Sequence, residues 1–315
     1  PPWLAGGLTD NGNGTAVLTG TPLAPGTYNV VLVVEDTEPA SSAQNFNIIV
    51  ADAIVVDQGA GGDYTTISTA IANAAEGDKI IVNDGTYTEN ITINKNVDFE
   101  AAIAGNAILT GDGTTSIVRF DGVSSIYFDG FIIEGGQGLN TDPAGNLLAF
   151  SSYYGGGLII ENSDLTISNT IIRNNIAPAF TSMNNGNSGG SGGGMYCVGS
   201  TITLQNVDIY DNQAEIYRGG GICADNCVLS LDNVDITNNS GGNYGGGIFA
   251  YRSTINITAP VNIQSNNVSG ENASGGGIFL LYSTIGGGAT ISGNSSSRNG
   301  IQQYIFDAGG ETTVP

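Results

Sequence analysis

Apolar and polar residues alternate in short runs through most of this chain, and the runs recur at a nearly constant spacing. In residues 254–263 the apolar positions are Ile255, Ile257, Val261 and Ile263, and a similar set lies one repeat earlier. Strict alternation is typical of half-buried strands. A fixed period of roughly 20–50 residues indicates stacked units, each too small to bury its own core. The pattern therefore predicts an all-β solenoid whose coils place these apolar residues inside.

Asparagine marks the same point of successive repeats. Each of five isoleucines is followed three residues later by asparagine, and the asparagines are separated by 37, 27, 27 and 28 residues. They are Asn175, Asn212, Asn239, Asn266 and Asn294. Stacked amides can hydrogen-bond to the coils above and below, which satisfies peptide groups at a tight turn. We expect a structural ladder rather than a ligand site.

Triple glycines run in phase with the asparagines. They end at Gly157, Gly194, Gly221, Gly247 and Gly277. Glycine there indicates backbone that turns sharply or adopts positive φ. A phosphate-binding loop is not expected, since no helix and no Lys-Ser/Thr follows. The repeats continue to about residue 306 and predict roughly nine coils.

A column of larger side chains follows the glycines by two residues. Its members are Tyr196, Cys223, Phe249 and Phe279, with Tyr251 and Tyr282 nearby. If the residue directly after each triple glycine faces inward, this column faces outward. Exposed Tyr196, Phe249, Tyr251 and Phe279 would suit a sugar chain or a protein partner. The alternative is that the long loops at 135–154 and 177–190 cover them.

Residues 1–51 differ from the rest in their sequence pattern and are predicted to form a separate domain. Residues 27–34 and 44–50 are expected strands, and Asp10–Gly14 is a hairpin-type turn. The segments that carry a resemblance are Trp3-Leu4, 9–16, 18–22, 26–28 and 34–36. They resemble the C-terminal part of an immunoglobulin-like or cadherin-like bacterial surface domain of the dystroglycan type. The resemblance implies a partial β-sandwich and a larger parent protein.

Residues 52–315 are predicted to form the solenoid. A short helix is expected at 68–75, with Ile67, Ala70, Ile71 and Ala74 on one face. The segments Tyr64–Ile67, Gly77-Asp78, Gly85–Tyr87 and Glu89–Ile91 complete a match. This stretch resembles the N-terminal cap and first coil of pectate-lyase-like right-handed parallel β-helices. The later repeats, with their Gly-Gly-Gly-Ile and Asn-Asn motifs, resemble the repeats of polymorphic outer-membrane proteins. Both resemblances imply a right-handed parallel β-helix with a capping helix.

Charge excludes one class of partner. Lysine and arginine total 7 against 29 acidic residues, so the formal net charge is −22. Binding nucleic acid requires clustered cations, and none are present. No apolar run approaches the roughly 18 residues of a membrane span, so membrane insertion is not expected. The family resemblances imply an extracellular or cell-surface protein.

The absence of histidine removes several kinds of catalysis. Without it there is no histidine-dependent triad, zinc site or general base. The signature motifs of pectin methylesterases and polygalacturonases are not found either. A lyase site remains open, with Arg173 or Arg218 beside Asp208, Asp211 or Asp235. The alternative is a surface arginine paired with an aspartate on the next coil.

Metal binding and disulfides are left open by the sequence. No three carboxylates stand at calcium-ligand spacing, and the turn at Asp10–Gly14 fits a hairpin as well as a calcium loop. No cofactor is expected, and calcium remains an open alternative. Cys223 and Cys227 flank a short polar loop that a disulfide could close. Free buried thiols, including Cys197, are the alternative.

The functional expectation is a non-catalytic structural or adhesive module of a large secreted bacterial cell-surface protein or appendage. Its partners would be a polysaccharide or protein at a cell surface, or further copies or domains of the same protein. The alternatives are a calcium-dependent polysaccharide lyase and a carbohydrate-binding β-helix domain.

Overall fold

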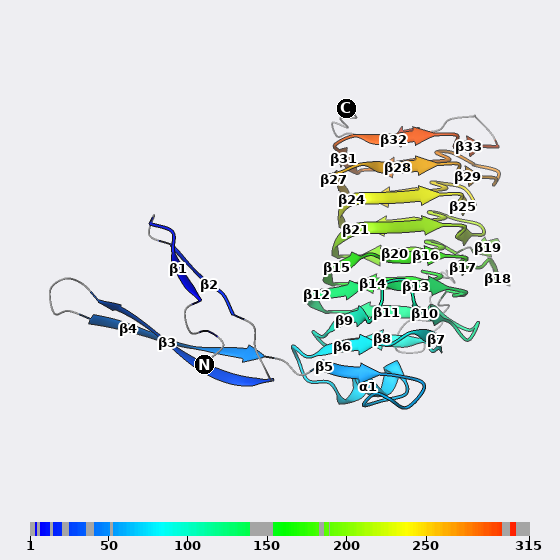
Figure 1. Ribbon diagram of the computed structural model, residues 1–315. Coiled ribbons are helices and arrows are strands. Elements are labelled where there is room, and N and C mark those ends of the chain that lie inside the picture. The colour runs from blue at the N-terminus through cyan, green and yellow to red at the C-terminus, as the bar shows by residue number, and fades with distance from the viewer. Residues whose placement is uncertain are drawn as a thin grey trace.

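The computed structural model describes residues 4, 7–12, 15–20, 25–35, 41–50, 53–138, 154–182, 186–188, 190–297 and 303–306. From Ala53 onward the chain forms a right-handed parallel β-helix, in which short strands of successive coils lie directly above one another (Figure 1). This confirms the predicted fold class. Among the described residues, no helix is long and apolar enough to cross a membrane.

The largest sheet has 15 strands and forms two arms of the coil. The first arm stacks β5 (Ala53–Val56), β6 (Lys79–Val82), β9 (Asp98–Ala101), β12 (Ser124–Asp129), β15 (Asp164–Ser168), β21 (Thr201–Tyr210), β24 (Val228–Thr237), β27 (Thr254–Ile257) and β31 (Thr284–Gly286). The second arm stacks β7 (Gly85–Thr88), β10 (Ala107–Thr110), β13 (Phe131–Glu134), β16 (Ile171–Arg173), the ends of β21 and β24, β28 (Val261–Gln264) and β32 (Ala289–Ser292). The strands β21 and β24 join the two arms.

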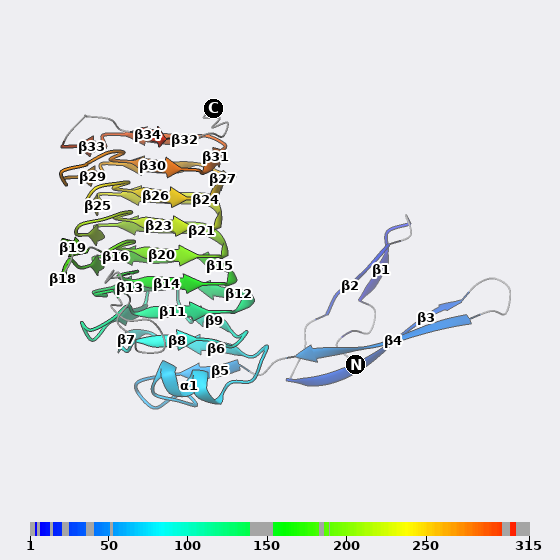
Figure 2. The ribbon, with the colours of Figure 1, turned by 180° about the vertical axis from the view of Figure 1, so that it is seen from behind.

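A second sheet of eight strands closes the coil, and Figure 2 shows several of its strands stacked one above another. Its strands are β8 (Ile91–Ile93), β11 (Val118–Asp121), β14 (Leu158–Glu161), β20 (Met195–Val198), β23 (Ile222–Asp225), β26 (Ile248–Tyr251), β30 (Ile278–Leu281) and β34 (Gln303–Phe306). Shorter pairings extend the turns, in a five-stranded sheet and a two-stranded hairpin. They are β17 (Ile176–Ala177), β22 (Gln213–Ala214), β25 (Ser240–Gly241), β29 (Asn267–Val268) and β33 (Ser295–Ser296), and the hairpin of β18 (Phe180–Ser182) with β19 (Gly186–Ser188).

The core is a continuous column of inward-facing side chains. Ile255, Val261 and Ile263 are buried, and half-buried Ile257 packs against them, as the alternation predicted. Strand register places each over an apolar residue of the previous coil; Ile263, for example, is the partner of Ile236. Because like residues stack at one level, each coil completes the core of its neighbours.

The first coil is closed by the predicted helix, α1 (Ile67–Asn73), which buries Ile67, Ala70 and Ile71 against the stack. Thr66 caps its N-terminus, and the Glu89 carboxylate accepts hydrogen bonds from the backbone N–H groups of Ile67 and Ser68. At the other end Lys95 Nζ donates to three carbonyl oxygens, those of Ile71, Ala72 and Ala74, at 2.8–3.0 Å. Both helix ends are therefore satisfied, and Lys95 has a structural role.

The asparagine ladder is confirmed. In a typical step, Asn239 donates from Nδ2 to Asn266 Oδ1 at 3.0 Å and to the Ile209 carbonyl at 2.8 Å. Its backbone N–H also donates to Asn266 Oδ1, at 2.9 Å. Each amide thus links three consecutive coils, and the five side chains are buried. This is how the turn satisfies its peptide groups without water.

The triple glycines have two causes, of which the positive φ was expected and the close approach of the coils was not. The first of each set adopts positive φ, for example +63° at Gly219. At the second position the coils approach too closely for a side chain: a Cβ on Gly220 would lie 2.5 Å from the Gly246 carbonyl oxygen. Glycine is therefore required by conformation at one position and by space at the next.

The N-terminal region contains the predicted strands. The strands β3 (Gly26–Glu35) and β4 (Ser41–Val50) form one antiparallel hairpin, and β1 (Leu8–Asp10) and β2 (Ala16–Leu18) form another. Among the described residues, these hairpins share no strand pairing with each other or with the stack. An immunoglobulin-like sandwich is therefore not shown, and the division at residues 51/52 stays a prediction.

Candidate functional site

The second arm of the large sheet carries a polar cluster on its outer side. Asp208 lies between the inward residues Val207 and Ile209, and its register partner on the next coil is Asp235. The partner of Asp235 on the following coil is Asn262. Neighbouring strands lie about 4.8 Å apart, so the two aspartates stand directly one above the other. With Glu134, Arg173 and Tyr210 they form what we call the outer-face cluster.

The two carboxyl groups of this cluster have different surroundings. Partial burial raises the pKa of Asp208, and the charge of Asp235 raises it further. Asp235, by contrast, accepts a hydrogen bond from Asn262 Nδ2 at 2.7 Å. Two adjacent carboxyls with dissimilar environments can divide the roles of acid and base.

Arg173 lies in the neighbouring column of the same arm, in register with Glu134 and Tyr210. It lies two residues along β16 from Ile171, the register partner of Asp208. Its Nε donates to Glu134 Oε2 at 2.7 Å and its Nη1 donates to the Tyr210 hydroxyl at 3.0 Å. The hydrogen bond to Tyr210, followed by that to Glu134, raises the pKa of Arg173. The guanidinium is thus held in one orientation on the outer face.

The arginine partners differ from those expected. Asp211 was a candidate partner of Arg173, but Asp211 occupies a left-handed turn position (φ 54°), and the register partner of Arg173 is Tyr210. Arg218 does not lie on this arm. It directly precedes a triple glycine and forms backbone β-bridges with Ser191 and Tyr244, which hold the same position on the neighbouring coils. Arg173, Asp208 and Asp235 therefore lie on the second arm, whereas Arg218 lies elsewhere, and a catalytic role for any of them stays a prediction.

The sequence analysis missed Glu134 and Tyr210 of the cluster, and also Asn262, the hydrogen-bond partner of Asp235. A signal for two of them is present in the sequence. Asp208, Asp235 and Asn262 each stand four residues before a ladder asparagine, and Arg173 and Tyr210 each stand two before one. Counting back from the ladder would have aligned these residues coil by coil.

The aromatic column has the expected register but not the expected exposure. Phe249 and Phe279 stack on each other with ring centroids 5.7 Å apart, outside the main core. They are only 2% and 7% exposed, because Tyr244 packs over Phe279 at 4.7 Å and the Arg218 guanidinium over Phe249 at 4.8 Å. Of the two alternatives, cover rather than exposure holds for these two rings, and Tyr244 and Arg218 supply it.

The other two aromatic candidates are more accessible. Tyr196 and Tyr251 are half-buried, and burial raises the pKa of the Tyr196 hydroxyl. The neighbour of Tyr251, Tyr282, is 51% exposed, with its ring 5.9 Å away. Ligand binding by any of these rings stays a prediction.

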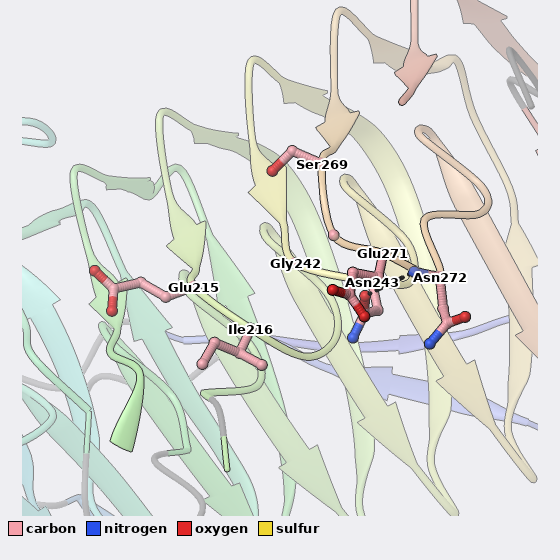
Figure 3. A pocket seen from close by; sticks show the side chains of 8 residues that line it. Glu215, Ile216, Gly242, Asn243, Ser269, Glu271 and Asn272 are labelled. Carbon is pink, nitrogen blue, oxygen red and sulfur yellow. Dashed lines mark hydrogen bonds between the residues drawn. The ribbon is translucent and has the colours of Figure 1, made fainter. Parts of the chain in front are cut away.

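A pocket of about 360 Å³ opens among the loops of three later coils (Figure 3). Its walls are Glu215, Ile216, Gly242, Asn243, Ser269, Gly270, Glu271 and Asn272. Backbone hydrogen bonds fix these loops to one another, including Gly270 N–H to the Gly242 carbonyl at 2.6 Å. The sequence did not indicate this pocket, because its residues belong to loops that break the repeat.

The cysteines do not form the disulfide considered between Cys223 and Cys227. All three cysteines are free and buried. Cys223 faces outward into the aromatic column, whereas Cys227 faces the main core, so the coil wall separates them. Burial raises the pKa of the Cys223 thiol to about 12.

A metal site is not apparent in the part of the chain that the structure describes. No group of three or more cysteine, aspartate or glutamate side chains there is arranged to hold an ion. Calcium binding at the turn of Asp10–Gly14 lies partly outside the described residues and stays a prediction.

No protein-family model and no curated protein sequence matches this chain. Solved structures with a similar fold include a pectin methylesterase from carrot, at 16% identity and a TM-score of 0.45, covering 81% of this chain and 88% of that one. PemA from Erwinia chrysanthemi matches at 11% identity and a TM-score of 0.42, covering 76% and 80%. The enzyme from Yersinia enterocolitica matches at 12% and 0.38, covering 78% and 95%. At this distance the likeness concerns the fold.

These similar structures are enzymes, and the expectation of a non-catalytic structural or adhesive module is corrected accordingly. The reasoning behind that expectation was too narrow. A chain without histidine lacks imidazole chemistry, but paired carboxyls can perform acid–base and nucleophilic steps without it. The outer-face cluster contains two neighbouring carboxyl groups, those of Asp208 and Asp235.

Proposed function

We propose that this chain is an extracellular hydrolase that cleaves a polysaccharide, with Asp208 and Asp235 as its reacting carboxyl groups. The observation that carries the proposal is the direct stacking of these two aspartates on neighbouring strands, with the pKa of Asp208 raised. Like charges placed opposite each other in a sheet are destabilising. The next coil has neutral Asn262 at this position, so the fold does not require the second carboxylate.

The environments suggest which carboxyl does what. Asp208, with its raised pKa, retains a proton to higher pH and donates it to the leaving oxygen. Asp235, which accepts a hydrogen bond from Asn262, attacks the sugar or acyl carbon. Strand spacing of about 4.8 Å is near the roughly 5–5.5 Å carboxyl separation of hydrolases that form a covalent intermediate. Water then releases that intermediate, with Asp208 now accepting the proton.

Arg173 contributes binding rather than proton transfer. Its guanidinium, held by Glu134 and Tyr210 in the neighbouring column of the same arm, would supply oriented N–H donors to a sugar chain that lies across both columns. The net charge of −22 disfavours a polyanion. The proposed substrate is therefore a neutral or esterified polysaccharide, cleaved at a glycosidic or ester bond.

The setting of this activity rests on the resemblances. We propose that residues 1–51 are the C-terminal part of an immunoglobulin-like or cadherin-like domain and that the parent is a larger secreted bacterial protein. The described hairpins β1–β2 and β3–β4 are compatible with such a domain. The polysaccharide would then be encountered at a cell surface.

The test is hydrolysis of a panel of neutral and esterified polysaccharides, measured as new reducing ends and as released methanol or acetate. The wild-type protein should release product, and Asp208→Asn and Asp235→Asn should each lose about 100-fold or more. Asp232→Asn is the matched control, since it removes one charge from the same strand outside the cluster. Undiminished rates in both cluster variants, no release from any substrate, or an unsaturated lyase product would overturn the proposal.

A further inference from the structure

The left-handed turn after each strand of the eight-stranded sheet forms a column in which two members are unlike the rest. In six successive coils, the residue that directly follows the strand has a φ between +47° and +69°. These residues are Gly122, Asn162, Gly199, Asn226, Arg252 and Tyr282. Glycine adopts this conformation at no steric cost and asparagine tolerates it, whereas a long side chain is strained there. Arg252 and Tyr282 therefore occupy a backbone conformation that disfavours them.

This strain is confined to these two residues. The other non-glycine residues with a positive φ in the described part of the chain are alanine, serine, asparagine and aspartate, all of them short. The preceding coils have Gly199 and Asn226 at the same position, so the stacking of coils does not require a long side chain there. Strain that the fold does not need is typical of functional sites. The two residues thus point to a function on this face.

The two strained side chains flank a third residue and form an exposed surface with it. Arg252 is exposed, and Tyr282 is 51% exposed. The Arg252 guanidinium lies 4.8 Å from the ring centroid of Tyr251, and the Tyr282 ring lies 5.9 Å from the same ring. Asp225 is half-buried and is the register partner of Tyr251 on the preceding coil. We call Asp225, Tyr251, Arg252 and Tyr282 the tyrosine ledge.

The chemistry of the tyrosine ledge suits a neutral sugar. An exposed tyrosine ring packs against the apolar C–H face of a sugar ring, while a guanidinium and a carboxylate can bond to its hydroxyl groups. The net charge of −22 disfavours an anionic ligand. A stable protein interface would need about 800 Å² on each partner. Among the described side chains, the strands of the eight-stranded sheet contribute no exposed large apolar residue that could extend the ledge so far.

We propose that the tyrosine ledge binds a neutral saccharide, with one sugar ring stacked on Tyr282 and hydroxyl groups bonded to Arg252 and Asp225. The ledge lies at the end of strands of the eight-stranded sheet, whereas the outer-face cluster lies on the second arm of the large sheet. Binding at the ledge therefore does not depend on the proposed hydrolysis.

The experiment measures binding by calorimetric titration of the full chain carrying Asp208→Asn and Asp235→Asn, so that no probe is cleaved. The probes are cellohexaose, xylohexaose and mannohexaose. We expect at least one of them to bind and to slow hydrogen exchange in the peptides that contain Tyr251, Arg252 and Tyr282. In the same background, Tyr282→Gly should weaken that binding about 10-fold or more, because the stacking ring is lost. Arg252→Gly should weaken it as well.

The unfolding midpoint separates binding from a structural role. Glycine relieves the strain of a positive φ, so Tyr282→Gly and Arg252→Gly should unfold at the same denaturant concentration as their parent or at a higher one. Asn226→Gly is the matched control. It makes the same change one coil earlier, outside the ledge, and should leave the affinity for the sugar unchanged.

Several results would overturn the proposal. They are no binding of any probe, binding that both ledge variants retain in full, and a lower unfolding midpoint in both, which would give the two side chains a structural role. Self-association that Tyr282→Gly abolishes, measured by sedimentation equilibrium without any bound probe, would assign the ledge to a protein interface instead. Binding at the ledge without hydrolysis by the wild-type protein would refute the proposed function alone.

Discussion

Two outer faces of the same coil have opposite characters. On the second arm of the large sheet, Asp208, Asp235 and Asn262 point outward and the aspartates are exposed. On the eight-stranded sheet, Phe249 and Phe279 also point outward, yet they form a second apolar core beneath Tyr244 and Arg218. Register stacks the residues equally well on both faces. Whether an outward-facing column is exposed or buried therefore depends on the residues that pack over it.

The largest expected change in the free energy of unfolding comes from removing a buried ring of the aromatic column. Phe249→Ala should lower the free energy of unfolding by about 3–5 kcal/mol, because it removes a buried ring and leaves a cavity. The matched exposed residue is Tyr282, and Tyr282→Ala should cost about 0.5 kcal/mol or less. Urea denaturation of both variants tests the contrast. Equal losses would mean that the two aromatic positions do not differ in burial as described.

A second effect compares the buried and exposed amide columns. Asn239→Ala removes an amide whose Oδ1 and Nδ2 both bond to neighbouring coils, and should cost about 2–3 kcal/mol. Asn233 sits in an exposed column, bonded to Asn206 at 2.9 Å, and Asn233→Ala should cost less than about 1 kcal/mol. Thermal unfolding would rank the two. If the exposed change cost as much, burial would not be what makes the ladder strong.

The smallest effect concerns repulsion on the polar face. Asp208→Asn should stabilise the protein by a few tenths of a kcal/mol at neutral pH, since it removes one of two like charges on neighbouring strands. The pKa of Asp208 is raised in the folded state, so its ionisation opposes folding. This penalty is present above the folded-state pKa and disappears as pH falls toward the unfolded value.

The stability difference between Asp208→Asn and the wild-type protein is measured from denaturation midpoints at neutral and acidic pH. The stabilising difference between Asp208→Asn and wild type should shrink on acidification, whereas Asp232→Asn should show no comparable change. A gain that grows at low pH would contradict the raised pKa. Loss of activity together with a gain in stability is the combination expected of a carboxylate retained for catalysis.

Much of the scaffold could be predicted from the sequence because it is periodic. Every coil makes the same contacts with its neighbours, so the residues that make them recur at a fixed spacing. This is true of the ladder asparagines, the triple glycines and the alternating apolar residues around Ile255 and Ile263. The capping helix was predicted for a different reason, since Ile67, Ala70 and Ile71 recur at helical spacing and are buried.

The rest depends on contacts that the repeat does not encode. The cover over Phe249 comes from Arg218 and Tyr244, which share the position directly before a triple glycine with Ser191 and Ser274, so the residue type there changes from coil to coil. The partner of Arg173 is Glu134, 39 residues away on a coil of irregular length. Likewise, Cys223 and Cys227 are close in sequence, but the left-handed turn at Asn226 lies between them, and they belong to two different apolar clusters.

In the proposed function, Asp208 and Asp235 act together as a proton donor and a nucleophile. The most direct test is the initial rate of product release across pH on the substrate that the wild-type protein cleaves. We expect a bell-shaped profile whose alkaline limb follows Asp208, with Asp235→Asn inactive at every pH and Asp208→Asn lacking that limb. The same bell-shaped profile and rate in the double variant Asp208→Asn/Asp235→Asn would contradict it.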